Sequence, residues 1–195
     1  MRQILSILLL TFLIFSCNTT EINQEEKFIN DVLFSIIADN PDIFNSDCKL
    51  LDKLSNRFMP PSINYDIDST FLDSIKDFFD EKEFDNLLRQ KLNLEKFSVL
   101  TTIFGSKYRL IKLAEIDSLI SRVETNKQLD YWTEFENEVG CLQIISRPII
   151  SADKKTVVVR HMELIGPHTA SGFIIVFQLR NDKWIVAREI ETWIS

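Results

Sequence analysis

The sequence is poor in the residues that most reactive sites require. Its 195 residues include four glycines, two histidines and three cysteines. So few glycines argue against a phosphate-binding loop, and the sequence has no P-loop, dinucleotide-binding, Gly-x-Ser-x-Gly or His-Glu-x-x-His motif. The cysteines form no Cys-x-x-Cys pair and no Cys/His cluster, which leaves a structural zinc site without support. We therefore expect no cofactor and no bound metal.

Positive charge is also scarce. The chain has 22 lysines and arginines against 29 acidic residues, a net charge of −7. Such a surface disfavours nucleic acid and anionic lipid headgroups as partners, so we expect no nucleic acid to bind. A hydrophobic content of 45% with 15 phenylalanines instead indicates a packed globular protein.

The N-terminal residues have the order of an export signal. Arg2 supplies positive charge, residues 4–15 are almost entirely apolar, and Ser16 is a small residue directly before Cys17. The apolar run spans about 12 residues, whereas a membrane-spanning helix needs about 20. We therefore expect residues 1–16 to be a signal peptide.

The run Ile14-Phe15-Ser16-Cys17 resembles the lipobox of bacterial lipoprotein signals. The resemblance implies cleavage before Cys17, a thioether-linked diacylglyceryl group on its sulfur, and labelling with palmitate. Two or three acyl chains hold a protein stably on a bilayer. The open alternatives are a conventional cleaved signal with an incidental cysteine and an uncleaved anchor.

The residues after the lipobox define the expected location. Residues 17–24 are short and polar and would form a lipidated tether, which keeps the folded part close to the membrane. Asn18 is not the aspartate that retains some lipoproteins in the inner membrane. By this resemblance the cell envelope is the expected location, with the outer membrane favoured over the inner, and the occupied face remains open.

Residues 25–138 are predicted to be mainly helical, because apolar residues recur at helical spacing. Residues 94–113 are ambiguous and include one short extended piece near residue 110. The predicted helices cover residues 25–39, 47–58, 69–79, 81–92, 116–122 and 131–138.

The remaining residues, 139–195, change to a strand pattern. Four β-rich runs are separated by short turn-forming segments, and connections this short join antiparallel neighbours. We expect an α+β fold, in which N-terminal amphipathic helices pack on a C-terminal four-stranded antiparallel meander, with 25–195 as one domain. On the last run we place Trp184, Val186, Ile190 and Ile194 on one face and Glu189, Glu191 and Trp193 on the other.

The C-terminal third carries a second resemblance. Trp132-x-x-Phe135, the run Ile145-Ser146-Arg147-Pro148 and the terminal Trp193-Ile194-Ser195 are similar to uncharacterised bacterial exported proteins. Those proteins have a strand-rich module that ends in Trp-(Val/Ile)-Ser. The shared motifs are packing motifs, so the resemblance implies a fold and no activity.

The clearest candidate site consists of His161, Glu163 and His168. The first two alternate onto one strand face and the third follows in the adjoining turn, so His161 could act as a base oriented by Glu163. The ordinary interpretation is a pair of solvent-exposed strand residues. Glu189 and Glu191 could also pair with Glu163 across the sheet, as in glycoside hydrolysis, although a solvated strand face explains them as well.

Two cysteines remain once Cys17 is acylated. Cys48 and Cys141 either form a disulfide or stay as two separately buried thiols, and the sequence favours the second interpretation.

These observations leave two classes of function. The first is a membrane-anchored envelope lipoprotein, not an enzyme, that binds a protein, peptide or glycan. The alternative is a small envelope hydrolase that uses His161, Glu163 and His168.

Overall fold

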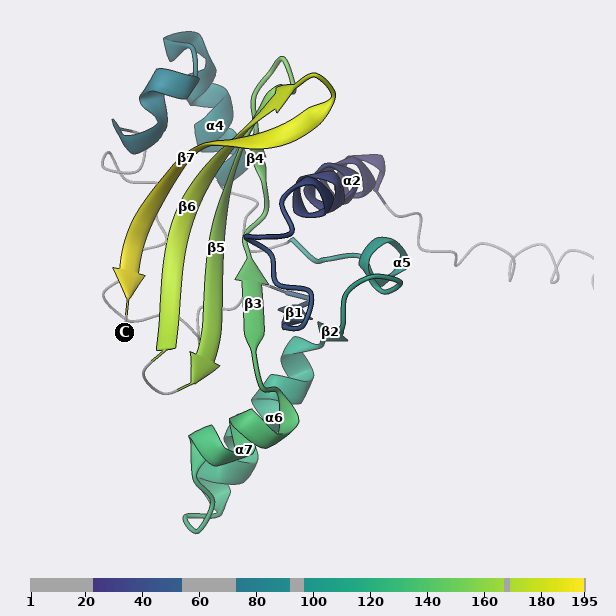
Figure 1. The fold of residues 1–195 in the computed structure, drawn as a ribbon, viewed down its shortest axis with the longest axis vertical. Helices are drawn as coiled ribbons and strands as arrows, with labels where there is room; N and C mark the ends of the chain where they lie inside the picture. Colours follow the sequence, from purple (N-terminus) through teal and green to yellow (C-terminus); the bar gives the residue numbers. More distant parts are fainter. Residues whose placement is uncertain (1–22, 54–72, 92–96, 167–168, 195) are drawn as a thin grey trace, which may run out of the picture.

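The computed structural model describes residues 23–53, 73–91, 97–166 and 169–194, which form an α+β fold with one mixed sheet of seven strands (Figure 1). This confirms the predicted α+β class. The helices are α2 (Gln24–Asp39), η2 (Lys76–Phe78), η3 (Glu81–Glu83), α4 (Phe84–Lys91), α5 (Thr101–Phe104), α6 (Leu113–Thr125) and α7 (Tyr131–Glu138). The strands are β1 (Lys49–Leu51), β2 (Leu110–Ile111), β3 (Leu142–Ile145), β4 (Ile149–Ile150), β5 (Thr156–Gly166), β6 (Thr169–Arg180) and β7 (Lys183–Ile194).

The sheet is larger than the predicted four-stranded meander. Its strand order is β2-β1-β3-β5-β6-β7, and β4 also pairs with β5. β5, β6 and β7 are long and antiparallel to their neighbours. Asn181 and Asp182 connect β6 to β7 with φ values of 50° and 59°, which is the backbone of a two-residue hairpin turn.

The other half of the sheet was predicted only in part: the short extended piece expected near residue 110 is β2, and β3 lies within 139–195, where strands were expected, but the parallel pairing was not predicted. β1 pairs in parallel with both β2 and β3, so the sheet is mixed. The predicted helix over 47–58 is wrong at Lys49–Leu51, which is β1; residues 54–58 lie outside the described residues. Leu50 and Leu51 are both buried, in clusters on opposite faces of the sheet. A strand buried on both faces gives a continuous apolar run, and here that run resembles a helical stripe.

Two irregularities in β7 change which of its side chains share a face. The register with β6 shifts between Val176 and Phe177 and again between Gly172 and Phe173. Glu189 and Glu191 therefore lie opposite Ile175 and Phe173, on the same face as Trp184, Val186 and Ile194. Ile190 and Trp193 lie on the other face, so the predicted arrangement is wrong for Glu189, Ile190 and Glu191, whereas Trp193 lies on the face away from Trp184 as predicted. A one-residue bulge reverses which side chains point to each face of the strand, and the sequence pattern does not show where a bulge lies.

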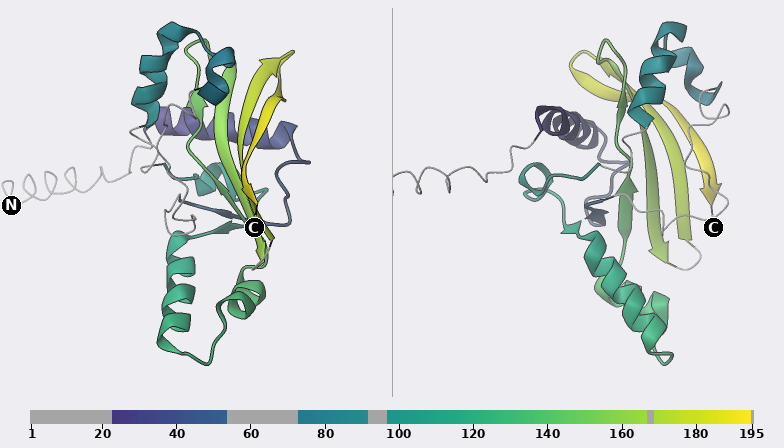
Figure 2. Two further views of the ribbon diagram at one scale, coloured as in Figure 1. Left: turned by 90° about the vertical axis from the view of Figure 1, so that its left-hand side faces the viewer. Right: turned by 180° about the vertical axis from the view of Figure 1, so that it is seen from behind.

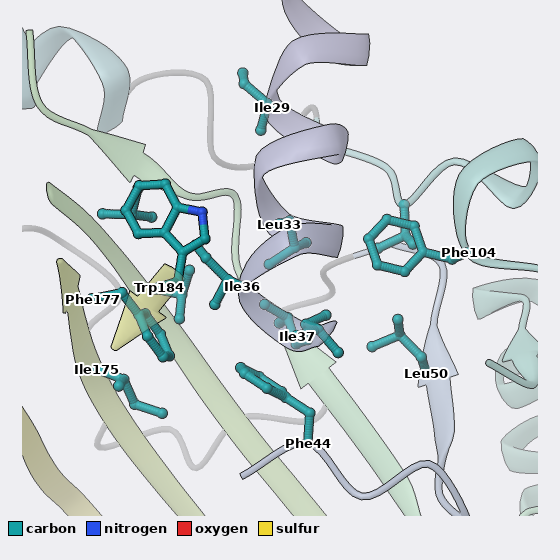
Figure 3. Packing of buried hydrophobic residues seen from close by; sticks show 14 of the residues in the cluster. Ile29, Leu33, Ile36, Ile37, Phe44, Leu50, Phe104, Ile175, Phe177 and Trp184 are labelled. Carbon is teal, nitrogen blue, oxygen red and sulfur yellow. The ribbon is translucent and has the colours of Figure 1, made fainter. Parts of the chain in front are cut away.

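Helices cover both faces of the sheet. On one face, buried residues of α2 pack with residues from β5, β6 and β7, and Figure 3 shows Ile36 of α2 beside Phe177 and Trp184. The opposite face packs against α4 toward one end, through Leu87, and against α6 and α7 toward the other, through Leu119 and Phe135. The views from the side and from behind show α6 and α7 extending beyond the end of the sheet at which β3 begins (Figure 2).

Polar side chains fix α2 against the sheet. At its C-terminal end, Asp39 Oδ2 accepts a hydrogen bond from the backbone nitrogen of Trp184 at 2.9 Å, and Asn40 Nδ2 donates to the Trp184 carbonyl at 3.1 Å. Within the helix, the buried Asn30 donates to the Ser98 carbonyl and accepts from the Leu100 nitrogen. Both backbone groups of Trp184 are thus satisfied where β7 begins.

Candidate functional site

His161 and Glu163 lie on the face of β5 that packs toward α2. In the register of the sheet His161 lies between Ile145 on β3 and Phe173 on β6. Glu163 lies between Gln143 and Ser171 on the same two strands. The predicted shared face is therefore present.

His161 is a core residue. Its exposed fraction is 3%, and its ring contacts Phe44 edge-on with 5.1 Å between the ring centroids. Burial lowers the pKa of His161 to about 4, because the charged form would lose its hydration. Nε2 has no hydrogen-bond partner among the described residues. The ordinary interpretation of His161 as a solvent-exposed strand residue is wrong, since Phe44 covers it.

Glu163 has different neighbours. Its Oε1 lies 3.4 Å from the sulfur of Cys48 and 3.6 Å from the sulfur of Cys141. Within the described ranges no hydrogen bond joins Glu163 to His161. The carboxylate therefore does not orient the imidazole, and these two residues do not form a base with its orienting partner.

The third residue of the predicted trio, His168, lies outside the described residues. The use of His161, Glu163 and His168 in hydrolysis stays a prediction. The burial of His161 gives it no support, because a general base must reach the proton that it abstracts.

The acidic residues of the last strand do not join Glu163. β6 lies between β5 and β7, so Glu163 has Ser171 as its neighbour rather than Glu189 or Glu191. Both β7 glutamates are exposed. The suggested pairing across the sheet is wrong, because β6 separates Glu163 from both glutamates.

Cys48 and Cys141 form a disulfide, with 4.6 Å between their Cα atoms and a sequence separation of 93. The fold places them together, because each directly precedes one strand of the parallel pair β1 and β3, whose first residues are Lys49 and Leu142. Gly140, with φ of 74°, ends α7 just before Cys141. The favoured expectation of two separately buried thiols is wrong.

The disulfide, Glu163 and Gln143 together make a polar corner at one end of the α2-facing side. Cys48 and Gln143 are almost fully buried, with exposed fractions of 1% and 2%, and Gln143 Nε2 has no hydrogen-bond partner among the described residues. Cys141 and Glu163 are half-buried. The ligand atoms of Cys48, Cys141 and Glu163 all lie within 4.8 Å of one another. We call these four residues the sulfur corner.

Sequence reasoning named Cys48, Cys141 and Glu163 and considered a bond between the two cysteines, but it did not place Glu163 beside them, and it missed Gln143. Cys141 and Glu163 are 22 residues apart, and Cys48 comes from a distant part of the chain. A sequence motif reports neighbours along one element, whereas this corner needs the parallel pairing of β1 with β3. These residues come together only through the pairing register of β1, β3 and β5, which the sequence does not show.

The three tryptophans do not form a shared binding patch. Trp184 is buried in the core under α2. Trp132 and Trp193 are half-buried against the cluster of α6 and α7. Trp193 lies across Gly172, where an added Cβ would be 2.2 Å from the indole nitrogen. Gly172 thus makes room for Trp193.

Comparisons with protein-family models, with curated proteins and with solved structures find no match to this chain. In the part of the chain that the structure describes, no helix is both long and apolar enough to cross a membrane.

Proposed function

We propose that this protein is a lipoprotein of the bacterial cell envelope, anchored by acyl chains on Cys17, whose α+β domain binds a partner without catalysing a reaction. The resemblance of residues 14–17 to a lipobox supports the anchor. The partner class is a protein, peptide or glycan near the membrane, and the outer membrane is the favoured location.

The observation that carries this proposal is the disulfide between Cys48 and Cys141. Disulfides persist in oxidising compartments such as the bacterial periplasm and are rare in the cytosol. The disulfide therefore supports a location of the protein outside the cytosol. This support is independent of the N-terminal residues, because the two cysteines meet through the fold.

The non-enzymatic part of the proposal draws support from His161. A buried imidazole with a pKa near 4 stays neutral at physiological pH and packs against Phe44. Such a residue contributes to the core and does not face a substrate. No observation on the described residues favours the hydrolase.

Metabolic labelling with palmitate tests the anchor. We expect the wild-type chain to be labelled and to fractionate with membranes, and Cys17→Ala to lose the label and accumulate with residues 1–16 attached. The matched control is the Cys48→Ser/Cys141→Ser double variant, which keeps the lipobox and should keep the label. Labelling of Cys17→Ala would show that the lipid is carried elsewhere and would refute the proposal.

A second experiment tests the binding role. The wild-type protein would be cross-linked in intact envelopes, in parallel with His161→Leu. A non-catalytic binding role predicts the same cross-linked partner for both proteins, in proportion to the folded protein present. Loss of a hydrolytic activity in His161→Leu, at an unchanged amount of folded protein, would favour the alternative.

A further inference from the structure

We propose that reduction of the Cys48–Cys141 disulfide converts the sulfur corner into a binding site for a thiophilic divalent cation, with Zn²⁺ as the representative ion. The ligands would be the sulfurs of both cysteines and Oε1 of Glu163. This inference does not depend on the lipid anchor, since all three ligands belong to the folded domain.

The geometry already places the ligands together. The three ligand atoms lie within 4.8 Å of one another. Zinc binds thiolate sulfur at about 2.3 Å and carboxylate oxygen at about 2.0–2.2 Å, so two ligands of one tetrahedral ion are separated by roughly 3.5–3.8 Å. Once the bond between the sulfurs is broken, small movements within the corner bring all three atoms to these separations.

Three separate elements hold the ligands in place. Lys49 at the start of β1 pairs with Leu142 at the start of β3, and this pairing fixes the residues directly before them, Cys48 and Cys141. The backbone nitrogen of Lys49 also donates a hydrogen bond to the Cys141 carbonyl at 2.9 Å. Glu163 is fixed by its register with Gln143. The backbone thus maintains the arrangement without the disulfide.

The polar groups of the corner are poorly satisfied in the oxidised protein. A disulfide sulfur has no proton to donate, so the two sulfur contacts do not hydrogen-bond the Glu163 carboxylate. Over the described ranges no N–H or O–H group donates to it. The amide of Gln143, its register neighbour, is buried with an unpartnered nitrogen. The half-buried Glu163 carboxylate therefore has no donor among the described residues that a bound cation would have to displace.

The chemistry requires a reductant, which we take to be a dithiol. It supplies two electrons and two protons, the sulfur–sulfur bond breaks, both cysteines become thiols, and the reductant closes its own disulfide. The cation then displaces the two thiol protons, because it binds the thiolate form. The oxidised protein cannot bind in this way, so the site is controlled by the redox state of the cysteines.

Metal titration of the detergent-extracted full chain tests the proposal. The protein would be reduced with a dithiol, freed of reductant without oxygen, and titrated with Zn²⁺ for stoichiometry and with Co²⁺ for thiolate-to-metal absorption. We expect one Zn²⁺ per reduced chain and none per oxidised chain. Glu163→Gln should weaken binding by more than about tenfold, since even outer-shell partners contribute 10–100-fold. The Cys48→Ser/Cys141→Ser variant should lose the absorption band.

The matched control is Glu191→Gln, which removes an exposed carboxylate on β7 and should bind Zn²⁺ as the wild type does. The proposal is overturned if the reduced wild type takes up no Zn²⁺, or if Glu163→Gln binds as tightly as Glu191→Gln. Far-UV circular dichroism is recorded throughout. A reduced chain that unfolds even with Zn²⁺ present also overturns the proposal, because the site needs β1, β3 and β5 to stay paired.

Discussion

The two halves of the sheet are built in different ways. β5, β6 and β7 are each 11 or 12 residues long, and β5 and β6 each pair with the strand that follows closely in the sequence. β1, β2 and β3 have two to four residues each and pair in parallel across long stretches of chain. The long half is therefore held by local contacts, whereas the short half depends on strand pairing and a disulfide between residues far apart in the chain.

The largest expected effect on stability comes from removing the Cys48–Cys141 disulfide, which joins the starts of β1 and β3. The Cys48→Ser/Cys141→Ser variant should lose about 2–5 kcal/mol of unfolding free energy, because the bond closes a long loop whose freedom returns in the unfolded chain. Hydrogen exchange should show β1 and β2 still paired but less protected than in the wild type, while β6 and β7 keep their protection. Equal loss of protection in both halves would contradict the comparison.

The next largest effect is the pH dependence of stability that His161 contributes. This residue lies on β5, between β3 of the short half and β6 of the long half. Its pKa of about 4 in the folded protein is below the ordinary value of 6.5, so the unfolded chain binds more protons between these values. Its contribution to stability is complete above about pH 6.5 and is lost as the pH falls through the folded pKa. The full loss is roughly 3 kcal/mol, at about 1.4 kcal/mol for each pKa unit.

Urea unfolding of the wild type and His161→Leu at pH 7.5 and pH 4.5 measures this loss. The variant cannot titrate at this position, so its stability should fall less over the same interval. Other titrating groups are common to both proteins and cancel in the difference. Equal changes in the two proteins would show that His161 is not buried as described.

The smallest expected effect concerns the turn of the long half. Asn181 has φ of 50°, a left-handed conformation that asparagine tolerates better than alanine. Asn181→Ala should therefore cost about 1 kcal/mol, while Asn181→Gly, which accepts this conformation without a steric penalty, serves as the matched control. Thermal unfolding of both variants checks the ranking, and equal losses would mean that the turn conformation carries no cost.

The same contrast explains what the sequence could predict. The turns around Asn181 and the alternation along 171–179 are local signals, and the strands expected there are present. β1 was mistaken for a helix, because Leu50 and Leu51 are buried on opposite faces and lose the strand alternation. The bulges of β7 leave no sequence mark, so the faces of Glu189 and Glu191 were assigned wrongly.

The candidate site was predictable only in part. The alternation of His161 and Glu163 placed them on one face, but their environments depend on distant residues. Phe44, from the segment between α2 and β1, covers the histidine, and the disulfide lies against the glutamate. Such contacts are set by tertiary packing, and a single sequence carries no local pattern for them.

The central claim is that an exported, lipid-anchored chain carries an intact disulfide, and mass spectrometry of the non-reduced, membrane-extracted protein tests it most directly. The account predicts a mature N-terminal peptide that begins at an acylated Cys17, together with a cross-linked peptide pair that contains Cys48 and Cys141. An unmodified Cys17, residues 1–16 still attached, or free thiols at both other cysteines would contradict it.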